Sequence, residues 1–188
     1  QWRDDAEMVL QYGYANLRIG RSAQAIESLH DPVIGRNAHA AAVAKLTYAW
    51  TTGWTSDPQE ALRLCEQAAP VLAAIDRAAE RGGMPQFPGV RRFELAADIA
   101  VGQANALLGR CDAAVEDMQR ALRHRSDIAA MQLPVVHGAL AQALAQQGDV
   151  AAARARAEEA LQIAAEAGLV NHHVRTVPAR IALATVAA

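Results

Sequence analysis

The stretch that decides the fold is Gly102-Gln103-Ala104-Asn105-Ala106-Leu107-Leu108-Gly109-Arg110-Cys111-Asp112-Ala113-Ala114. It places a glycine seven positions after a small residue, and an alanine five positions after that glycine. Met118 and Ala121 continue the pattern four and seven residues beyond Ala114. Small and apolar residues at these intervals follow the period of an α-helix, and Gly109 stands where one helix would end. The stretch therefore predicts two helices joined by a tight glycine turn.

The same spacing recurs on both sides of this stretch. The earlier copy has Gly13, Gly20, Ala25 and Leu29, and the later copy has Ala141, Gly148, Ala153, Ala157 and Ala160. A partial copy with Ala61, Cys65 and Ala68 follows Asp57 and Pro58, which are suited to cap and to open a helix. Small residues on both helices of a hairpin let the two backbones approach closely. Repetition of one such hairpin predicts a helical repeat protein.

Composition supports an all-α fold and argues against several functions. Hydrophobic residues make up 52% of the 188 residues, but aromatic residues only 4%, which is unlike the β-branched and aromatic mixture of sheets. The formal net charge of −2 lacks the basic excess with which proteins neutralise nucleic-acid phosphates. We therefore expect no direct contact between this segment and nucleic acid.

The repeated frame resembles the tetratricopeptide repeat, although Asn16, Asn105 and Leu144 stand where that family usually has aromatic residues. The resemblance implies an all-α, right-handed superhelical solenoid of helical hairpins. The uneven spacing of the copies is similar to that of sensor regions in bacterial transcriptional regulators. This narrower resemblance implies a binding or sensing module. The start of the chain does not have the form of a signal peptide, and the two cysteines do not suggest a disulfide framework, so we expect a cytoplasmic location. Since the chain begins with Gln1 and not with methionine, we expect it to be part of a longer protein.

The periodicity predicts a single domain of nine helices over 1–188. We expect these helices near 4–19, 22–30, 37–50, 58–80, 91–108, 111–124, 128–147, 150–167 and 171–187. They pair into hairpins over about 4–30, 37–80, 91–124 and 128–167, and the final helix at 171–187 is left over. An inserted loop at about 80–92 contains two adjacent glycines and two prolines, which do not continue a helix and suit a lid.

The resemblance also implies a binding groove, because the first helices of stacked hairpins line the concave surface. Tyr14, Gln103 and Gln142 each follow the small residue of a first helix, and Arg18 and Gln146 lie about one turn further along. Phenol and amide groups in such a groove can bind the backbone of an extended peptide. The alternative is that these residues are solvated helix positions. We expect a peptide or protein partner.

Two further interpretations are open. Trp50, Trp54, Phe87 and Phe93 are candidates for a pocket that senses a small hydrophobic ligand, or for an aromatic plug that fills an irregular repeat. The apolar final helix is a candidate for a homodimer contact, and the chain would then be a structural scaffold.

No motif for catalysis or cofactor binding is found. The sequence contains no phosphate-binding glycine loop, no nucleophile elbow and no paired carboxylates at catalytic spacing. Cys65 and Cys111 stand without ligand partners at metal-binding spacing, and no apolar run reaches membrane-spanning length. We expect no enzyme, no cofactor, no metal site and no membrane span.

Overall fold

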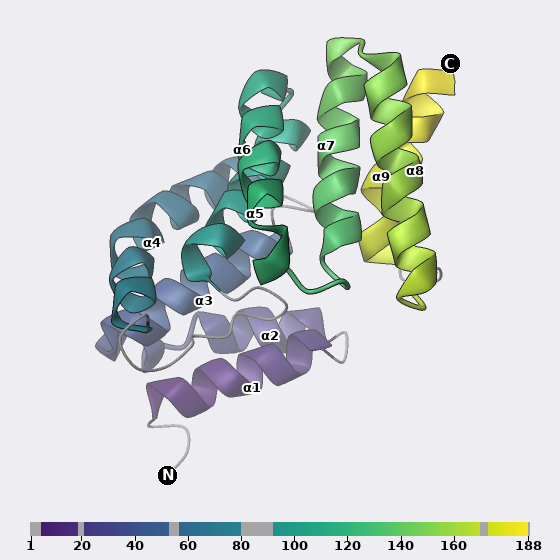
Figure 1. Cartoon of the computed structure of the whole chain (residues 1–188). Coiled ribbons are helices and arrows are strands. Elements are labelled where there is room, and N and C mark those ends of the chain that lie inside the picture. Colours follow the sequence, from purple (N-terminus) through teal and green to yellow (C-terminus); the bar gives the residue numbers. More distant parts are fainter. Residues whose placement is uncertain (1–4, 19–20, 53–56, 80–91, 170–172, 188) are drawn as a thin grey trace.

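The computed structural model describes residues 5–18, 21–52, 57–79, 92–169 and 173–187. Within these ranges the chain is all-helical, with nine α-helices, two short 3-10 helices and no strand (Figure 1). The α-helices are α1 (Ala6–Arg18), α2 (Ser22–Leu29), α3 (Ala38–Thr52), α4 (Pro58–Ala79), α5 (Phe93–Leu107), α6 (Cys111–Arg123), α7 (Leu133–Gln147), α8 (Val150–Glu166) and α9 (His173–Ala187). The 3-10 helices are η2 (Ile34–Arg36) and η3 (Arg125–Asp127). The predicted all-α class is confirmed.

Eight of the nine predicted helices begin and end within two residues of the observed bounds. The exception is α7, which was expected to begin at 128 and begins at Leu133. The prediction was wrong there because η3 and a turn occupy the chain after α6, and because Pro134 sits in the first turn of α7. Proline has no N–H to donate, so it is tolerated in the first turn of a helix and disfavoured further inside.

Helices that are adjacent in the sequence are adjacent in space. α1 packs on α2, α3 on α4, α5 on α6 and α7 on α8, which are the predicted hairpin pairs. α4 also contacts α5, and α6 contacts α7, so that consecutive pairs pack against one another. α9 packs on both α7 and α8 at the end of the molecule opposite α1 (Figure 1). The result is a continuous array of helices with the core between successive layers.

Two of the three predicted glycine turns lie in the described residues, and both are confirmed. Gly109 and Gly148 have φ angles of +71° and +85°, which favour glycine because a side chain would clash with its own backbone. The N–H of Gly109 donates to Ala106 O at 3.2 Å, and the next N–H donates to Asn105 O at 2.9 Å. These two bonds satisfy carbonyls at the end of α5. Gly20 lies outside the described residues.

The small residues of the repeated frame lie where two helices meet. Ala25, Ala114 and Ala153 have no exposed surface, as their predicted place in the interface requires. A Cβ added to Gly102 would lie 2.6 Å from Met118 Cε and 2.9 Å from Asp117 Cβ. The backbone of α5 therefore approaches α6 more closely than any side chain on Gly102 would permit.

A polar network crosses the same interface between α5 and α6. Asn105 Nδ2 donates to Asp117 Oδ2 at 3.0 Å. Arg120 also donates to Asp117, and through Nε and a terminal nitrogen to both oxygens of Asp98 at 3.2 and 3.1 Å. Burial raises the pKa of Asp117, although the bonds from Asn105 and Arg120 act in the opposite direction. The buried amide of Asn105 thus has a hydrogen-bond partner in the neighbouring helix.

The C-terminal helices pack through alanine. One cluster of buried residues contains Ala141, Ala157, Ala160, Ala179 and Ala182, from α7, α8 and α9. Gly138 lies in the same interface, where an added Cβ would be 3.0 Å from the backbone N of Ala179. Flat alanine surfaces allow three helices to pack at short interaxial distances.

Replacement of Gly102 by alanine tests the close approach of α5 and α6. Alanine has the higher helix propensity, yet we expect Gly102→Ala to lower the free energy of unfolding by about 1–3 kcal/mol, because the new Cβ overlaps Asp117 Cβ. Gly35→Ala is the matched control, since a Cβ there meets nothing within 4 Å. Urea denaturation of both variants measures the difference, and equal stability would contradict the close packing.

Candidate functional site

The described residues form an open pocket between the first and second hairpins. It is bounded by the end of α2, by η2, and by the facing sides of α3 and α4, and its volume is about 360 Å³. Its apolar wall consists of Leu29, Pro32, Ile34, Ala41, Ala44 and Leu64. Its polar groups are His30, Asp31, Lys45, Tyr48, Glu60, Arg63 and Gln67. This combination of an apolar wall with a few polar groups is typical of sites that bind a ligand or a side chain.

The pocket exists because the connection between α2 and α3 is long, and because hydrogen bonds hold this connection away from both helices. Asp31 Oδ1 accepts a hydrogen bond from the N–H of Val33 at 2.9 Å and so holds the turn that leads into η2. Asn37 Oδ1 accepts from the N–H of Ala40 at 3.1 Å and caps α3. The Asp31 bond fixes the turn after α2, the Asn37 bond fixes the start of α3, and η2 spans the distance between them.

Ionic contacts pre-arrange the α4 side of the pocket. Asp57 Oδ1 accepts from the N–H of Glu60 at 2.9 Å, as predicted for a helix that Pro58 opens. Arg63 Nε donates to Glu60 Oε2 at 2.6 Å, and this bond lowers the pKa of the Glu60 carboxyl. Because the Arg63 side chain is exposed and the Glu60 side chain is partly exposed, the pair orders the rim and adds little to stability.

The edge of the pocket also carries an aromatic contact. The His30 and Tyr48 rings meet edge to face, with their centroids 4.8 Å apart. This contact joins the last turn of the first hairpin to α3. The rings thus form a rigid part of the pocket border that a bound group can touch.

The residues predicted for a peptide groove lie elsewhere, and they differ in exposure. Tyr14 is half-buried and its phenol oxygen is 3.0 Å from Thr47 Oγ1, while burial raises the pKa of the phenol. Gln103 is only 4% exposed. Gln142 is half-buried and Gln146 is exposed, whereas the side chain of Arg18 lies outside the described residues. That these residues bind a peptide stays a prediction.

Gln103 is buried because α5 has neighbours on several sides. The helix α5 contacts α4, α6, α3 and α7. The side-chain nitrogen of Gln103 has no hydrogen-bond partner among the described residues. Sequence reasoning placed Gln103 on the concave face of the groove because it treated all copies of the frame alike. A helix in the middle of the array has fewer open positions than one at an end.

The predicted aromatic pocket is only partly described. Phe93 is 7% exposed and belongs to the main hydrophobic core, and Trp50 is half-buried against the same core. Neither lines the pocket between α2 and α4. Trp54 and Phe87 lie outside the described residues, as does nearly all of the loop predicted at 80–92.

Sequence reasoning missed a capping interaction at the start of α5. Asp76, on α4, is 4% exposed, and its two carboxylate oxygens accept from the N–H groups of Phe93 and Glu94 at 3.0 and 2.9 Å. These N–H groups belong to the first turn of α5 and have no acceptor in their own helix. The only sequence signal was an acidic residue on the predicted apolar face of a helix.

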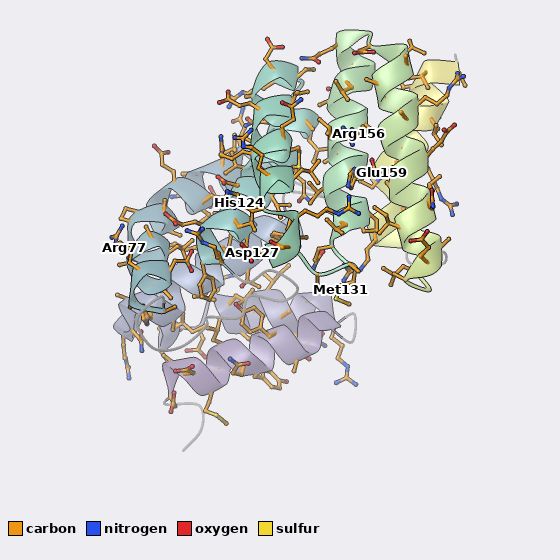
Figure 2. All side chains as sticks on the ribbon, in the orientation of Figure 1. Arg77, His124, Asp127, Met131, Arg156 and Glu159 are labelled. Carbon is orange, nitrogen blue, oxygen red and sulfur yellow. The ribbon has the colours of Figure 1, made fainter. Side chains whose placement is uncertain are left out.

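A second missed feature is a charged cluster around Glu159 on α8. Glu159 accepts a hydrogen bond from Arg156 at 2.9 Å and is 3.5 Å from Arg125 of η3. Its Oε2 also lies 3.3 Å from Nδ1 of His137, a residue of α7 that is 1% exposed. Figure 2 labels Arg156 and Glu159 where α8 faces α7. Glu159 thus joins three segments, namely η3, α7 and its own helix α8.

The remaining surface features are few. Val177 and Ile181 on α9 are 40% and 44% exposed, so the final helix does present two apolar side chains one turn apart. Self-association through α9 stays a prediction. In the described ranges no helix has both the length and the hydropathy of a membrane span, and no three metal-ligating side chains are grouped.

Comparisons with protein-family models, curated proteins and solved structures found no match to this chain.

The buried imidazole predicts a dependence of stability on pH. Burial lowers the pKa of His137 below its ordinary value of 6.5, because the charged form loses hydration. His137 then binds a proton more readily in the unfolded chain than in the folded one. Its burial therefore does not reduce the free energy of unfolding above pH 6.5, and the free energy of unfolding falls as the pH drops below 6.5. One such group changes the free energy of unfolding by at most about 1.4 kcal/mol per pH unit.

Denaturation of wild type and His137→Leu between about pH 7.5 and 5.5 measures this effect. The variant is expected to lose less stability than wild type over this range, and substitution of exposed His39 by glutamine serves as the control. An unchanged slope in His137→Leu would show that other groups cause the dependence.

The buried amide of Gln103 gives a separate prediction. An unpartnered buried donor costs about 1–3 kcal/mol, so Gln103→Met should raise the free energy of unfolding by roughly 1 kcal/mol. Gln142→Met, at a half-buried position of α7, should give no comparable gain. Thermal unfolding of the two variants compares them, and a loss of stability in Gln103→Met would mean that the amide has a partner.

Proposed function

We propose that the chain is a non-catalytic binding module, a right-handed solenoid of tetratricopeptide-like hairpins that recognises a peptide or a segment of a protein partner. The repeated small-residue frame, the left-handed glycine turns and the sequential packing of the helices support the proposed architecture. On the same resemblance, the module is the sensor or interaction region of a larger bacterial regulatory protein in the cytoplasm.

The pocket between α2 and α4 is the observation that carries the proposed function. Its volume of about 360 Å³ is at the lower end of the roughly 300–1,000 Å³ of small-molecule sites. A space of this size suits one large apolar side chain with the backbone next to it. Leu29, Ile34 and Leu64 provide the apolar contacts, and the polar rim provides donors and acceptors for the peptide backbone.

Two predicted groove residues on α7 provide a second proposed contact region, apart from the pocket. Gln142 and Gln146 are four residues apart and therefore share one face of the helix. Gln146 is exposed, and its Oε1 is 3.2 Å from Cys111 Sγ, a weak contact that a bound backbone can replace. We assign to both glutamines hydrogen bonds with a partner segment.

Selection of peptides from a random library tests the proposal. Peptides enriched on the wild-type chain are expected to bind Gly35→Ala equally well and Gly35→Trp at least about tenfold more weakly. Gly35 lines the pocket, and a Cβ at this position meets nothing within 4 Å. The indole of the Gly35→Trp variant is therefore expected to occupy the pocket without straining the core. Fluorescence anisotropy of labelled peptides measures both affinities.

Two outcomes would contradict the proposal. Equal binding to Gly35→Trp and wild type would exclude the pocket as the anchor site, and Gln142→Ala with Gln146→Ala would then test the face of α7. If no peptide is enriched, peptide binding itself is contradicted.

A further inference from the structure

The charge balance inside the pocket indicates which kind of peptide it takes. Lys45 is the single lysine of the chain, and it lies on α3, whose residues include no aspartate or glutamate. It is half-buried and lines the pocket beside Ala41 and Ala44. Among the described residues it has neither a hydrogen bond nor an ion pair. Its ammonium is therefore available to an anion that a ligand supplies.

The two carboxylates at the pocket are already engaged with other groups. Glu60 holds Arg63 with both oxygens, at 2.6 and 2.5 Å. Asp31 accepts the N–H of Val33 in the turn before η2. The two bonds to Glu60 neutralise Arg63, so among the described residues Lys45 is the lining lysine or arginine that forms no ion pair.

We propose that the pocket recognises an internal peptide segment in which an acidic side chain stands next to a large apolar one. This inference rests on the proposed peptide-binding function. The apolar side chain lies against Leu29, Ile34 and Leu64, and the acidic side chain accepts a charge-assisted hydrogen bond from Lys45 Nζ. The two contacts strengthen each other. The apolar wall excludes water from the ion pair with Lys45, and the ion pair fixes the orientation of the peptide segment.

Two dipeptides of equal size test the inference directly. The probes are N-acetyl-aspartyl-phenylalanine amide and N-acetyl-asparaginyl-phenylalanine amide, which differ only in the charge of one side chain. Ligand-observed NMR titration of the full chain measures both dissociation constants. We expect the aspartyl probe to bind wild type about five- to tenfold more tightly than the asparaginyl probe.

Variants locate the source of that preference. Lys45→Met keeps the apolar stem and should bind the two probes equally, whereas Lys45→Arg should retain the preference. Arg36→Met is the matched control, because Arg36 is an exposed cation of η2 that does not line the pocket, and it should leave both affinities unchanged. Circular dichroism and melting temperatures confirm that each variant is folded.

The outcomes separate this inference from the function on which it rests. If both probes bind wild type equally and Gly35→Trp abolishes their binding, peptide binding in the pocket stands and the acidic preference is overturned. The preference is also overturned if Lys45→Met retains it. If neither probe binds wild type, the acidic preference is overturned, and the library selection decides about peptide binding by itself.

Discussion

The structure depends on the close approach of two helix backbones within each hairpin. At Gly102 the space for a single methyl group is already taken by atoms of Asp117 and Met118. Such an approach requires a short connection whose geometry does not vary, and the left-handed glycines after α5 and α7 provide it. Once two helices are fixed in this way, their outer faces present apolar stripes that only a further hairpin can cover.

The pocket arises where this constraint is relaxed. α2 and α3 are joined by a longer connection that contains η2 and is held by Asp31 and Asn37 and not by a glycine turn. α2 and α3 consequently do not pack as tightly as the helices of a hairpin, and α4 cannot fill the space alone. Irregularity in a repeated architecture thus produces a concave surface, whereas the regular C-terminal part, packed through alanine, leaves little room between its helices.

The sequence was sufficient to predict the helices but not the pocket. Helix positions follow from local signals, namely the apolar period, Pro58, and glycines such as Gly109 and Gly148, so the predicted bounds agree closely. The start of α7 was misjudged because η3 has no comparable local signal. Contacts between distant residues, such as Asp76 with the start of α5 or Glu159 with His137, depend on the tertiary arrangement. The exposure of Gln103 likewise depends on how many helices surround α5.

The carboxylate of Asp76 has one more consequence, for the segment that connects α4 to α5. It holds the first turn of α5 directly against α4, so the position of α5 does not depend on the path of the intervening chain. The first turn of α5 is therefore anchored by a contact between the two helices themselves, and not only by the chain that joins them. Residues can be inserted or removed there over generations while the flanking helices stay in register. Insertions between α4 and α5 are therefore expected to leave the contact of Asp76 with α5 in place.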